Sequence, residues 1–451
     1  METPEILRER WATRMGFILA AVGSAVGLGN VWRFPFQVGQ EGGAAFLFMY
    51  LGFIFVIGFP AMLVEFVIGR ETKRNPVGAI RAWGGSSWRY VGWIFLIIGF
   101  VLLSFYSVVA GWTLRYFVGS FTGAYMDNPE AYFTQISVGW DAMFFHALFM
   151  AITIAIVAIG IKRGIERTAK VLVPAIIIIL LGLAIYAFSL DGAGAAYAYY
   201  LSPDVGEITA NWQSVLPAAA GQALFTLSLG MGVMITYASY IDEDRNLGED
   251  GVAIIGFDVL IAIIAGLVVF PIIFTAGVDP AGPGPGAIFV SLADAFSGIA
   301  FGWLIGAIFF GTFFFAALTS AISIIEVIVA YAIDEHDIDR QVATVVVGVI
   351  IFLLGVPTAF DSVIFGMYDQ LAAEVLLVFG TLLIMVLVGW VAAPRAKAEL
   401  SKGMDDPGVV TDIWIWLVRI PVILVLLISL YLALIGFVEF LQEVFLPWLS
   451  G

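Results

Sequence analysis

The sequence predicts an all-α integral membrane protein, and three observations lead to that prediction. Of the 451 residues, 61% are hydrophobic, which is more than a water-soluble domain needs for its core. Apolar runs of about 20 residues, the length that crosses a bilayer as a helix, recur along the chain. Basic residues alternate from one intervening loop to the next, as they do in polytopic membrane proteins. Because backbone amides in hydrocarbon must be satisfied internally, each run is expected to be a helix.

We predict eleven membrane-spanning helices within a single domain, residues 1–451. They cover residues 15–36, 43–69, 90–119, 138–160, 171–189, 214–240, 252–277, 301–333, 341–358, 366–392 and 413–440. The polar start of the chain is not a signal-peptide n-region, so the first run is expected to belong to the mature protein.

Lysine and arginine predict the orientation. Arg8, Arg10 and Arg14 precede the first helix, and every even-numbered loop also carries basic residues. The loops between helices 3 and 4, 5 and 6, 7 and 8, and 9 and 10 carry none. Since cytoplasmic loops are enriched in Lys and Arg, the N-terminus is predicted to be cytoplasmic. Eleven crossings would then place the C-terminus on the extracellular side of the cell membrane.

The composition argues against several classes of function. With 35 acidic and 20 basic residues the formal charge is −15, so the basic surface of a nucleic-acid-binding protein is absent. The sequence has no phosphate-binding loop, metal-ligand cluster or nucleophile–base spacing, and we predict neither an enzyme nor an organic cofactor. There is no cysteine, so disulfides contribute nothing.

Two of the runs contain glycine clusters that should interrupt a helix. The first run holds the cluster from Gly23 to Asn30, and the sixth holds the cluster from Ser228 to Gly232. Glycine costs about 1 kcal/mol relative to alanine inside a helix, so each cluster predicts an unwound stretch. Non-helical backbone at membrane depth is tolerated only inside protein or along a cavity. For one cluster alone, close packing of helices through small residues is the alternative explanation.

The position of the two interrupted helices favours an internal repeat. They begin two sets of five helices, residues 15–189 and 214–392, and residues 413–440 form an additional helix. Because five crossings is an odd number, the second set enters the membrane from the opposite side. Such inverted repeats bind their ligand near the bilayer midplane, between the broken helices.

These segments resemble a known family. Trp11-Ala12-Thr13-Arg14, the cluster from Gly23 to Asn30, and Trp32-Arg33-Phe34-Pro35 are similar to the first helix of neurotransmitter:sodium symporters. The resemblance continues through Glu65-Phe66, Gly69-Arg70, Gly111-Trp112-Thr113, residues 221–230 and 236–240, and Ala317-Leu318-Thr319-Ser320. It covers nearly the whole chain, although the twelfth helix of many members is lacking. The inverted-repeat rule was drawn in part from this family, so its agreement with the sequence is not independent.

The resemblance implies two sodium sites built from oxygen atoms, which hard cations prefer. The implied ligands of the second site are the carbonyls of Gly23, Val26 and Ala316 and the hydroxyls of Thr319 and Ser320. Those of the first site are the Ala25 carbonyl, Asn30, Thr226 and Asp258, with the carboxylate of the substrate. The alternative for Thr319 and Ser320 is hydrogen bonding back to their own helix.

The resemblance also implies an amino-acid site. The Leu28 and Gly29 amides and the Tyr106 hydroxyl would bind a carboxylate at the start of a half-helix. Monoamine carriers of the family have an acid where this chain has Gly27, so its absence favours a substrate with both charges. The implied substrate contacts are Ala25, Gly27, Leu28, Gly29, Leu102, Tyr106, Phe225, Thr226, Ser228, Met231, Ser320 and Ile324. The side-chain pocket is apolar, and the adaptable Met231 predicts tolerance of large hydrophobic amino acids.

Several residues match the gates of the family. A charge inside a membrane is costly and usually functional, which applies to Arg33, whereas Arg8 lies outside the bilayer and could instead be an ordinary determinant of topology. The matching positions are Arg33 and Asp369 at the outer end, with Phe225 as a lid, and Arg8, Asp334, Ser239 and Tyr240 at the inner end. Glu65 matches a glutamate that supports the unwound backbone. The sequence predicts no specific role for Glu326 or Glu374.

We therefore predict a sodium-coupled symporter that imports an α-amino acid by alternating access, with the substrate, sodium and the lipid bilayer as its partners. The fixed charge of Asp258 predicts chloride independence, because it can replace the mobile anion that many animal members need. Three alternatives stay open: a non-α amino acid or betaine-like osmolyte as substrate, a transport-dead sensor on the same fold, and an ion channel with a continuous pore.

Overall fold

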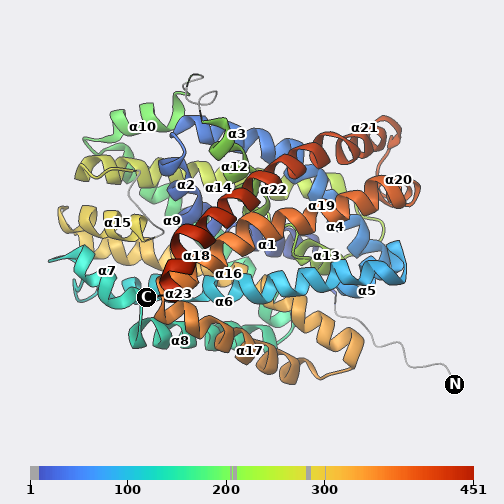
Figure 1. The fold of residues 1–451 in the computed structure, drawn as a ribbon, viewed down its shortest axis with the longest axis horizontal. Coiled ribbons are helices and arrows are strands. Elements are labelled where there is room, and N and C mark those ends of the chain that lie inside the picture. The colour runs from blue at the N-terminus through green and yellow to red at the C-terminus, as the bar shows by residue number, and fades with distance from the viewer. Residues whose placement is uncertain (1–9, 204–205, 207–210, 281–285, 300, 451) are drawn as a thin grey trace.

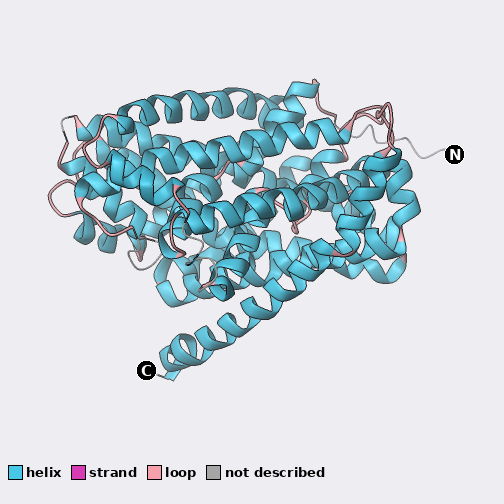
Figure 2. Cartoon of the chain, turned by 90° about the horizontal axis from the view of Figure 1, so that it is seen from above, coloured by secondary structure: helices cyan, strands magenta, loops and turns pink. Residues whose placement is uncertain are grey.

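The computed structural model describes residues 10–203, 206, 211–280, 286–299 and 301–450 (Figure 1). Within these residues the chain forms helices joined by loops, with no strand (Figure 2). The all-α fold class predicted from the sequence is confirmed.

The long helices account for most of the predicted spans. Nine helical stretches among the described residues are long and apolar enough to cross a membrane: Ala44–Thr72, Ser86–Ser120, Trp140–Ala158, Ile161–Phe188, Leu247–Ala276, Gly302–His336, Arg340–Phe360, Ser362–Val391 and Gly408–Ser450. A tenth consists of Arg14–Ala25 and Gly29–Gln40, which are bent by 42° at a short break. The sixth predicted run, 214–240, is present as two shorter helices, so the count of eleven crossings stays a prediction.

The spans are assembled from consecutive elements. In order they are α1 (Arg14–Ala25), the π-helix η1 (Gly29–Arg33) and α2 (Phe34–Gln40); α3 (Ala44–Phe53), η2 (Ile54–Gly58) and α4 (Phe59–Thr72); α6 (Arg89–Ser120); α8 (Trp140–Ala158); η4 (Ile161–Ile165) and α9 (Glu166–Phe188); α12 (Trp212–Thr226) and α13 (Val233–Ala238); α14 (Leu247–Ala276); α16 (Gly302–His336); α17 (Arg340–Phe360); α18 (Ser362–Asp369), η5 (Gln370–Leu376), α19 (Leu377–Val386) and η6 (Leu387–Val391); and α21 (Gly408–Arg419), α22 (Pro421–Phe440), η7 (Leu441–Phe445) and α23 (Leu446–Ser450).

Short helices occupy the loops, and the sequence analysis did not predict them. They are α5 (Pro76–Gly84), η3 (Ser86–Trp88), α7 (Pro129–Ser137), α10 (Ala193–Leu201), α15 (Ala287–Ser297) and α20 (Ala393–Leu400). Helices α7, α10 and α15 gather at one end of the bundle, and α5 and α20 lie at the other (Figure 1). This division follows the predicted alternation, because α5 and α20 come from the basic loops and the other three from loops without basic residues.

One predicted boundary was wrong by ten residues. The fifth run was predicted to begin at residue 171, but η4 begins the span at Ile161. Hydropathy missed the first turns because they carry polar residues such as Lys162 and Glu166. The preceding helix ends before Gly160, whose φ of 101° favours glycine.

Both predicted breaks are present. Helix α1 ends at Ala25, and helical structure resumes only at Gly29. The second break separates α12 from α13, and it contains Ser228, Gly230 and Gly232 with φ of 54°, 79° and 78°. Two of these left-handed positions are glycines, which adopt positive φ without steric cost. The breaks leave backbone amides and carbonyls free of intrahelical partners in the middle of the bundle.

Candidate functional site

A small central cavity lies between the two broken helices and α6 and α16. Its lining residues are Ser24, Ala25, Gly27, Gly29, Leu102, Tyr106, Phe225, Ser228, Met231, Ser320 and Ile324. Of the predicted substrate contacts, only Leu28 and Thr226 are missing from this lining. The free space is about 10 Å³, which is barely enough for one water molecule. The described conformation is therefore closed around the site, and a ligand must open it.

The unwound segment between α1 and η1 has its backbone amides next to α6. The Leu28 amide donates to the Tyr106 hydroxyl oxygen across 3.3 Å, and both residues are buried. The Gly27 amide donates to Asn30 Oδ1 at 3.2 Å, so a side chain holds the turn that follows the break. An oxygen-rich ligand group can compete for these donors, since neither amide is committed to a helix.

A cluster of buried serines connects the two broken helices with α16. The Ser228 and Ser320 hydroxyls both donate to the Ser24 carbonyl oxygen, at 3.0 and 2.8 Å. The Ser24 hydroxyl lies 3.0 Å from that of Ser228 and 2.6 Å from that of Ser323. The sequence analysis missed Ser24 and Ser323. Ser24 lies inside the glycine cluster of helix 1, which was a signal that could have identified it.

The side chains predicted for the first sodium site converge on Asp258, which is fully buried. Its Oδ1 accepts hydrogen bonds from Asn30 Nδ2 at 2.8 Å and from Thr226 Oγ1 at 2.9 Å. Its Oδ2 accepts from the Tyr50 hydroxyl at 3.4 Å, a partner that the sequence analysis did not identify. The Ala25 carbonyl accepts the Gly27 amide at 3.0 Å at the edge of the same break. One carboxylate and several neutral oxygens are a ligand set suited to a hard cation.

The residues predicted for the second sodium site lie where α1 approaches α16. A Cβ added at Gly23 would lie 3.3 Å from the Cβ of Thr319, so the two helices are in contact there. The Thr319 hydroxyl donates back to the Ala316 carbonyl at 3.0 Å, which is the alternative that the sequence left open. The Ser320 hydroxyl instead donates to the carbonyl oxygen of Ser24 on α1. Val26, which directly follows α1, is also buried.

Glu65 on α4 stabilises the break between α12 and α13, which together form the sixth predicted span. Its Oε1 accepts the Gly230 amide at 2.8 Å, and its Oε2 accepts the Ile235 amide at 3.2 Å. The side chain is fully buried. The carboxylate thus replaces the helical carbonyl partners that these amides lack, at the position where the sequence predicted structural support.

Arg33, which was predicted for the outer gate, lies beside the central cavity with only 3% of its side chain exposed. Its guanidinium lies 5.2 Å from the ring centroid of Phe225, which lines the cavity. Its Nε is 3.9 Å from Asp369 Oδ1, the predicted partner. Two further partners are Gln222 Oε1 at 3.2 Å and Glu374 Oε1 at 3.5 Å. The structure therefore brings Arg33, Asp369 and Phe225 together and adds two side chains to them.

Tyr240, which was predicted for the inner gate, contacts a buried ion pair. Its hydroxyl donates to Glu326 Oε1 at 2.8 Å. Glu326 is fully buried, and Arg340 donates to both of its carboxylate oxygens, at 2.7 and 3.1 Å. Glu326, which had no predicted role, thus connects the segment after α13 to the start of α17. Ser239 is buried beside Tyr240 and donates to the Thr236 carbonyl at 2.6 Å.

Asp334, also predicted for the inner gate, accepts the backbone amide of Asn75 at 2.8 Å. Its predicted partner Arg8 lies outside the described residues. Next to this region, Trp11 donates its indole N–H to the Tyr237 carbonyl at 3.0 Å. This bond fastens the segment before α1 to α13.

Lys73 lies just beyond the end of α4 at the same end of the molecule, and its ammonium donates to the Ile241 carbonyl. Partial burial lowers the pKa of this lysine from 10.5 to about 8, although the nearby charges of Asp242 and Glu243 oppose the shift. Lys73 lies outside the membrane spans, and its pKa is shifted toward neutral pH.

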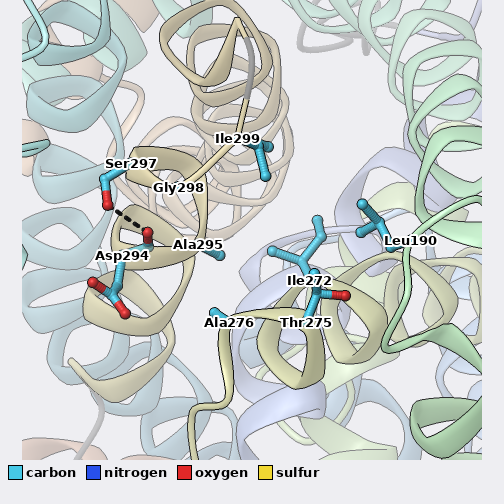
Figure 3. A pocket seen from close by; sticks show the side chains of 9 residues that line it. All are labelled: Leu190, Ile272, Thr275, Ala276, Asp294, Ala295, Ser297, Gly298 and Ile299. Carbon is cyan, nitrogen blue, oxygen red and sulfur yellow. Dashed lines mark hydrogen bonds between the residues drawn. The ribbon is translucent and has the colours of Figure 1, made fainter.

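A larger cavity of about 270 Å³ lies at the end of the bundle that carries α15. It is lined by Leu190, Ile272, Thr275, Ala276, Asp294, Ala295, Ser297, Gly298 and Ile299 (Figure 3). The Ser297 hydroxyl donates to the Asp294 carbonyl, and Leu190 lies on the opposite side of the space (Figure 3). None of the predicted site residues lines this cavity, so the smaller central cavity is the candidate functional site.

The site can be compared with those of known proteins. The chain matches the model of the sodium:neurotransmitter symporter family over residues 8–138 and 137–449. It is 34% identical over 449 residues to the uncharacterized sodium-dependent transporter YhdH of Bacillus subtilis, covering 96% of this chain and 98% of that protein. It is 27% identical over 459 residues to the sodium- and chloride-dependent GABA transporter ine of Drosophila melanogaster, covering 88% of this chain and 48% of that protein.

Among solved structures, the chain is similar to MhsT in complex with L-phenylalanine. The sequences are 42% identical, the TM-score is 0.88, and the match covers 94% of this chain and all of the MhsT chain. The two chains therefore share a fold over nearly their whole length.

Proposed function

Because this chain belongs to the sodium:neurotransmitter symporter family, we propose that it imports an α-amino acid together with sodium. As a member of this family it is a multi-pass membrane protein and a sodium-dependent symporter, and not an enzyme. The proposal adds the class of substrate, the ion sites and the direction of transport.

One observation carries the choice of an α-amino acid. The Leu28 amide and the Tyr106 hydroxyl meet beside the cavity, where residue 27 is a glycine and not an acid. These groups are suited to a carboxylate, and no acidic side chain among the cavity-lining residues is available for an isolated amine. MhsT, which shares 42% of its sequence with this chain, binds L-phenylalanine, and this supports the same substrate class.

The lining of the cavity favours a hydrophobic side chain on the substrate. Leu102, Phe225, Met231 and Ile324 contribute apolar surface, and the hydroxyls of Ser228 and Ser320 gather around Ser24. An apolar pocket discriminates poorly between side chains that differ by one methylene. We therefore infer that leucine, phenylalanine and tryptophan compete for the same site.

We assign two sodium ions to the two sets of oxygen atoms. The first ion would be bound around Asp258, with Asn30, Thr226 and the Ala25 carbonyl. The second would be bound between α1 and α16, at Gly23, Val26, Ala316, Thr319 and Ser320. Because the buried carboxylate of Asp258 supplies a negative charge beside the first ion, transport is proposed to be independent of chloride.

The contacts at the two ends of the site support alternating access. Arg33 with Asp369 would close the outer path, and the contacts of Tyr240 and Asp334 would close the inner one. The N-terminus is proposed to be cytoplasmic and the C-terminus extracellular. Since the chain has no native cysteine, single cysteines placed at either end and labelled in intact cells test this orientation directly.

Uptake by purified protein in proteoliposomes tests the function. A panel of labelled amino acids, with γ-aminobutyrate and glycine betaine as comparison substrates, is supplied with an inward sodium gradient or with potassium. We expect saturable, sodium-dependent uptake of large hydrophobic amino acids. Uptake restricted to betaine or γ-aminobutyrate would reject the substrate class, flux that does not saturate would indicate a channel, and sodium-dependent binding without uptake would indicate a sensor.

A further inference from the structure

Glu374 is the acidic residue near the site to which the proposed function gives no role. We propose that Glu374 is a second acid of the outer gate, which shares Arg33 with Asp369. This inference rests on the proposed gate role of Arg33 and Asp369. It assigns a positioning role to a residue that does not contact the substrate cavity.

The contacts of the Arg33 guanidinium support this assignment. Its NH2 nitrogen is 3.5 Å from Glu374 Oε1, whereas its Nε is 3.9 Å from Asp369 Oδ1. Gln222 accepts from the remaining NH1 nitrogen at 3.2 Å. Each nitrogen of the guanidinium thus faces a different side chain, and the shorter of the two charged contacts is with Glu374.

Burial explains why one carboxylate is not enough. The side chain of Arg33 is 3% exposed, while those of Asp369 and Glu374 are 23% and 35% exposed. A guanidinium removed from water needs its charge balanced and its donors satisfied. At 3.9 Å, Asp369 balances charge but makes no hydrogen bond, and its Oδ1 has no hydrogen-bond partner in the described part of the chain. Glu374 and Gln222 supply acceptors that Asp369 does not.

The π-helix η5 brings the two acids to the same side of the span. Residues 369 and 374 are five positions apart, and in an α-helix they would lie about 140° apart around the axis. In a π-helix, where hydrogen bonds join residues i and i+5, such positions lie close together on one face. Asp369 directly precedes η5 and Glu374 lies within it. The local widening of the helix thus allows both carboxylates to face Arg33.

Two acids around one cation change how the gate opens. With a single partner, Arg33 would have to leave its only carboxylate before the outer path widened. With two, the guanidinium can separate from Asp369 while Glu374 still balances its charge. The gate then opens by exchange between partners, and no opening step leaves the arginine unpaired in a part of the protein that excludes water.

Accessibility of the cavity from outside measures this gate without relying on transport. The chain has no cysteine, so Leu102→Cys introduces a single thiol, which lies in the central cavity. A membrane-impermeant thiol reagent is added to intact cells, and the rate of labelling is measured in four backgrounds: unchanged, Asp369→Asn, Glu374→Gln and both together. Asp294→Asn is the control, because this acid lines the larger cavity and is not among the ion-pair partners of Arg33 in the described residues.

We expect faster labelling in each single variant and a larger effect in the double variant. If the acids replace one another, the double effect exceeds the product of the single effects by at least about twofold, the lower end of coupling between contacting residues. Glu374→Asp, which retains a carboxylate, should label more slowly than Glu374→Gln, and Asp294→Asn should match the unchanged background. A double variant that labels no faster than Asp369→Asn alone would overturn the inference.

Arg33→Gln separates this inference from the gate itself. If that variant labels at the unchanged rate, the proposed gate role of Arg33 fails. If it labels faster while Glu374→Gln does not, the gate stands and only the role of Glu374 is rejected. Monodisperse elution of each variant in detergent shows that the compared proteins are folded.

Discussion

Asn30 donates a hydrogen bond of 2.8 Å to the carboxylate of Asp258, and both side chains are fully buried. Asn30 belongs to the restarted half of helix 1, whereas Asp258 lies in the middle of α14. This buried carboxylate also accepts from Thr226, and it is proposed to supply the negative charge beside the first sodium ion. The first prediction concerns the ion that this charge would replace.

Asp258→Asn should either abolish uptake or make it depend on chloride. The substitution preserves shape but removes the negative charge beside the proposed first sodium ion, and a mobile anion is then needed. Uptake is measured in chloride and in gluconate media, where the unchanged protein should behave identically. Asp294→Asn, an acid on α15 that lines the larger cavity, is the control. Unaltered ion dependence in Asp258→Asn would contradict the assignment.

The combined substitution Thr319→Val and Ser320→Ala should remove the dependence on sodium at the second site. It deletes two oxygens with little change of volume. Sodium should raise the melting temperature less than it does in the unchanged protein, because the stabilisation by the second ion disappears with its binding. Without sodium the loss of two hydrogen bonds should cost about 1 kcal/mol each. Thr312→Val is the control, since its hydroxyl also donates to its own helix, at Ile308. Wild-type stabilisation by sodium in the double variant would reject the site.

Glu65→Gln should destabilise the protein and weaken substrate binding together. The amide nitrogen of glutamine cannot accept a hydrogen bond, so the buried amide of Gly230 or Ile235 loses its partner. An unsatisfied buried donor costs about 1–3 kcal/mol. The melting temperature and the binding affinity are measured for this variant and for Glu439→Gln, which changes an exposed glutamate on α22. If Glu65→Gln keeps both its melting temperature and its binding affinity, the break between α12 and α13 does not depend on Glu65.

Lys73 should make stability rise with pH above about 8. Its pKa is about 8 in the folded protein and 10.5 when unperturbed, so the unfolded chain holds the proton more tightly between these values. The contribution of this residue to the free energy of unfolding therefore increases with pH across that window. The melting temperature of the unchanged protein minus that of Lys73→Gln should grow between pH 7 and pH 10. The same comparison with Lys162→Gln, which changes an exposed lysine of η4, is the control.

Sequence patterns located the centre of this molecule well. The glycine clusters predicted both interrupted helices, since an unwound segment needs residues that tolerate positive φ, as Gly230 and Gly232 do. Together with the resemblance, they identified the residues that surround the central cavity. The helices themselves follow from hydropathy, because hydrocarbon leaves the backbone few other choices.

The partners added by the structure were hidden for physical reasons. Glu374 lies five residues after Asp369, and α-helical periodicity would place it on another face, so only the π-helix reveals its approach to Arg33. Tyr50 contacts Asp258 across more than two hundred residues, and no local pattern encodes that proximity. The direction of the Thr319 hydroxyl depends on its rotamer, which a sequence does not specify.

The bond between the Ser320 hydroxyl and the Ser24 carbonyl joins residues that are 296 positions apart. During biosynthesis the ribosome needs roughly 15–60 s to add that much chain, at about 5–20 residues per second. Throughout that interval helix 1 is already made, but α16 does not yet exist to complete its broken segment. Nascent chains shorter than about 320 residues are therefore expected to lack the second ion site and to have an incomplete substrate site, and the bilayer or the insertion machinery must accommodate the unwound backbone in the meantime.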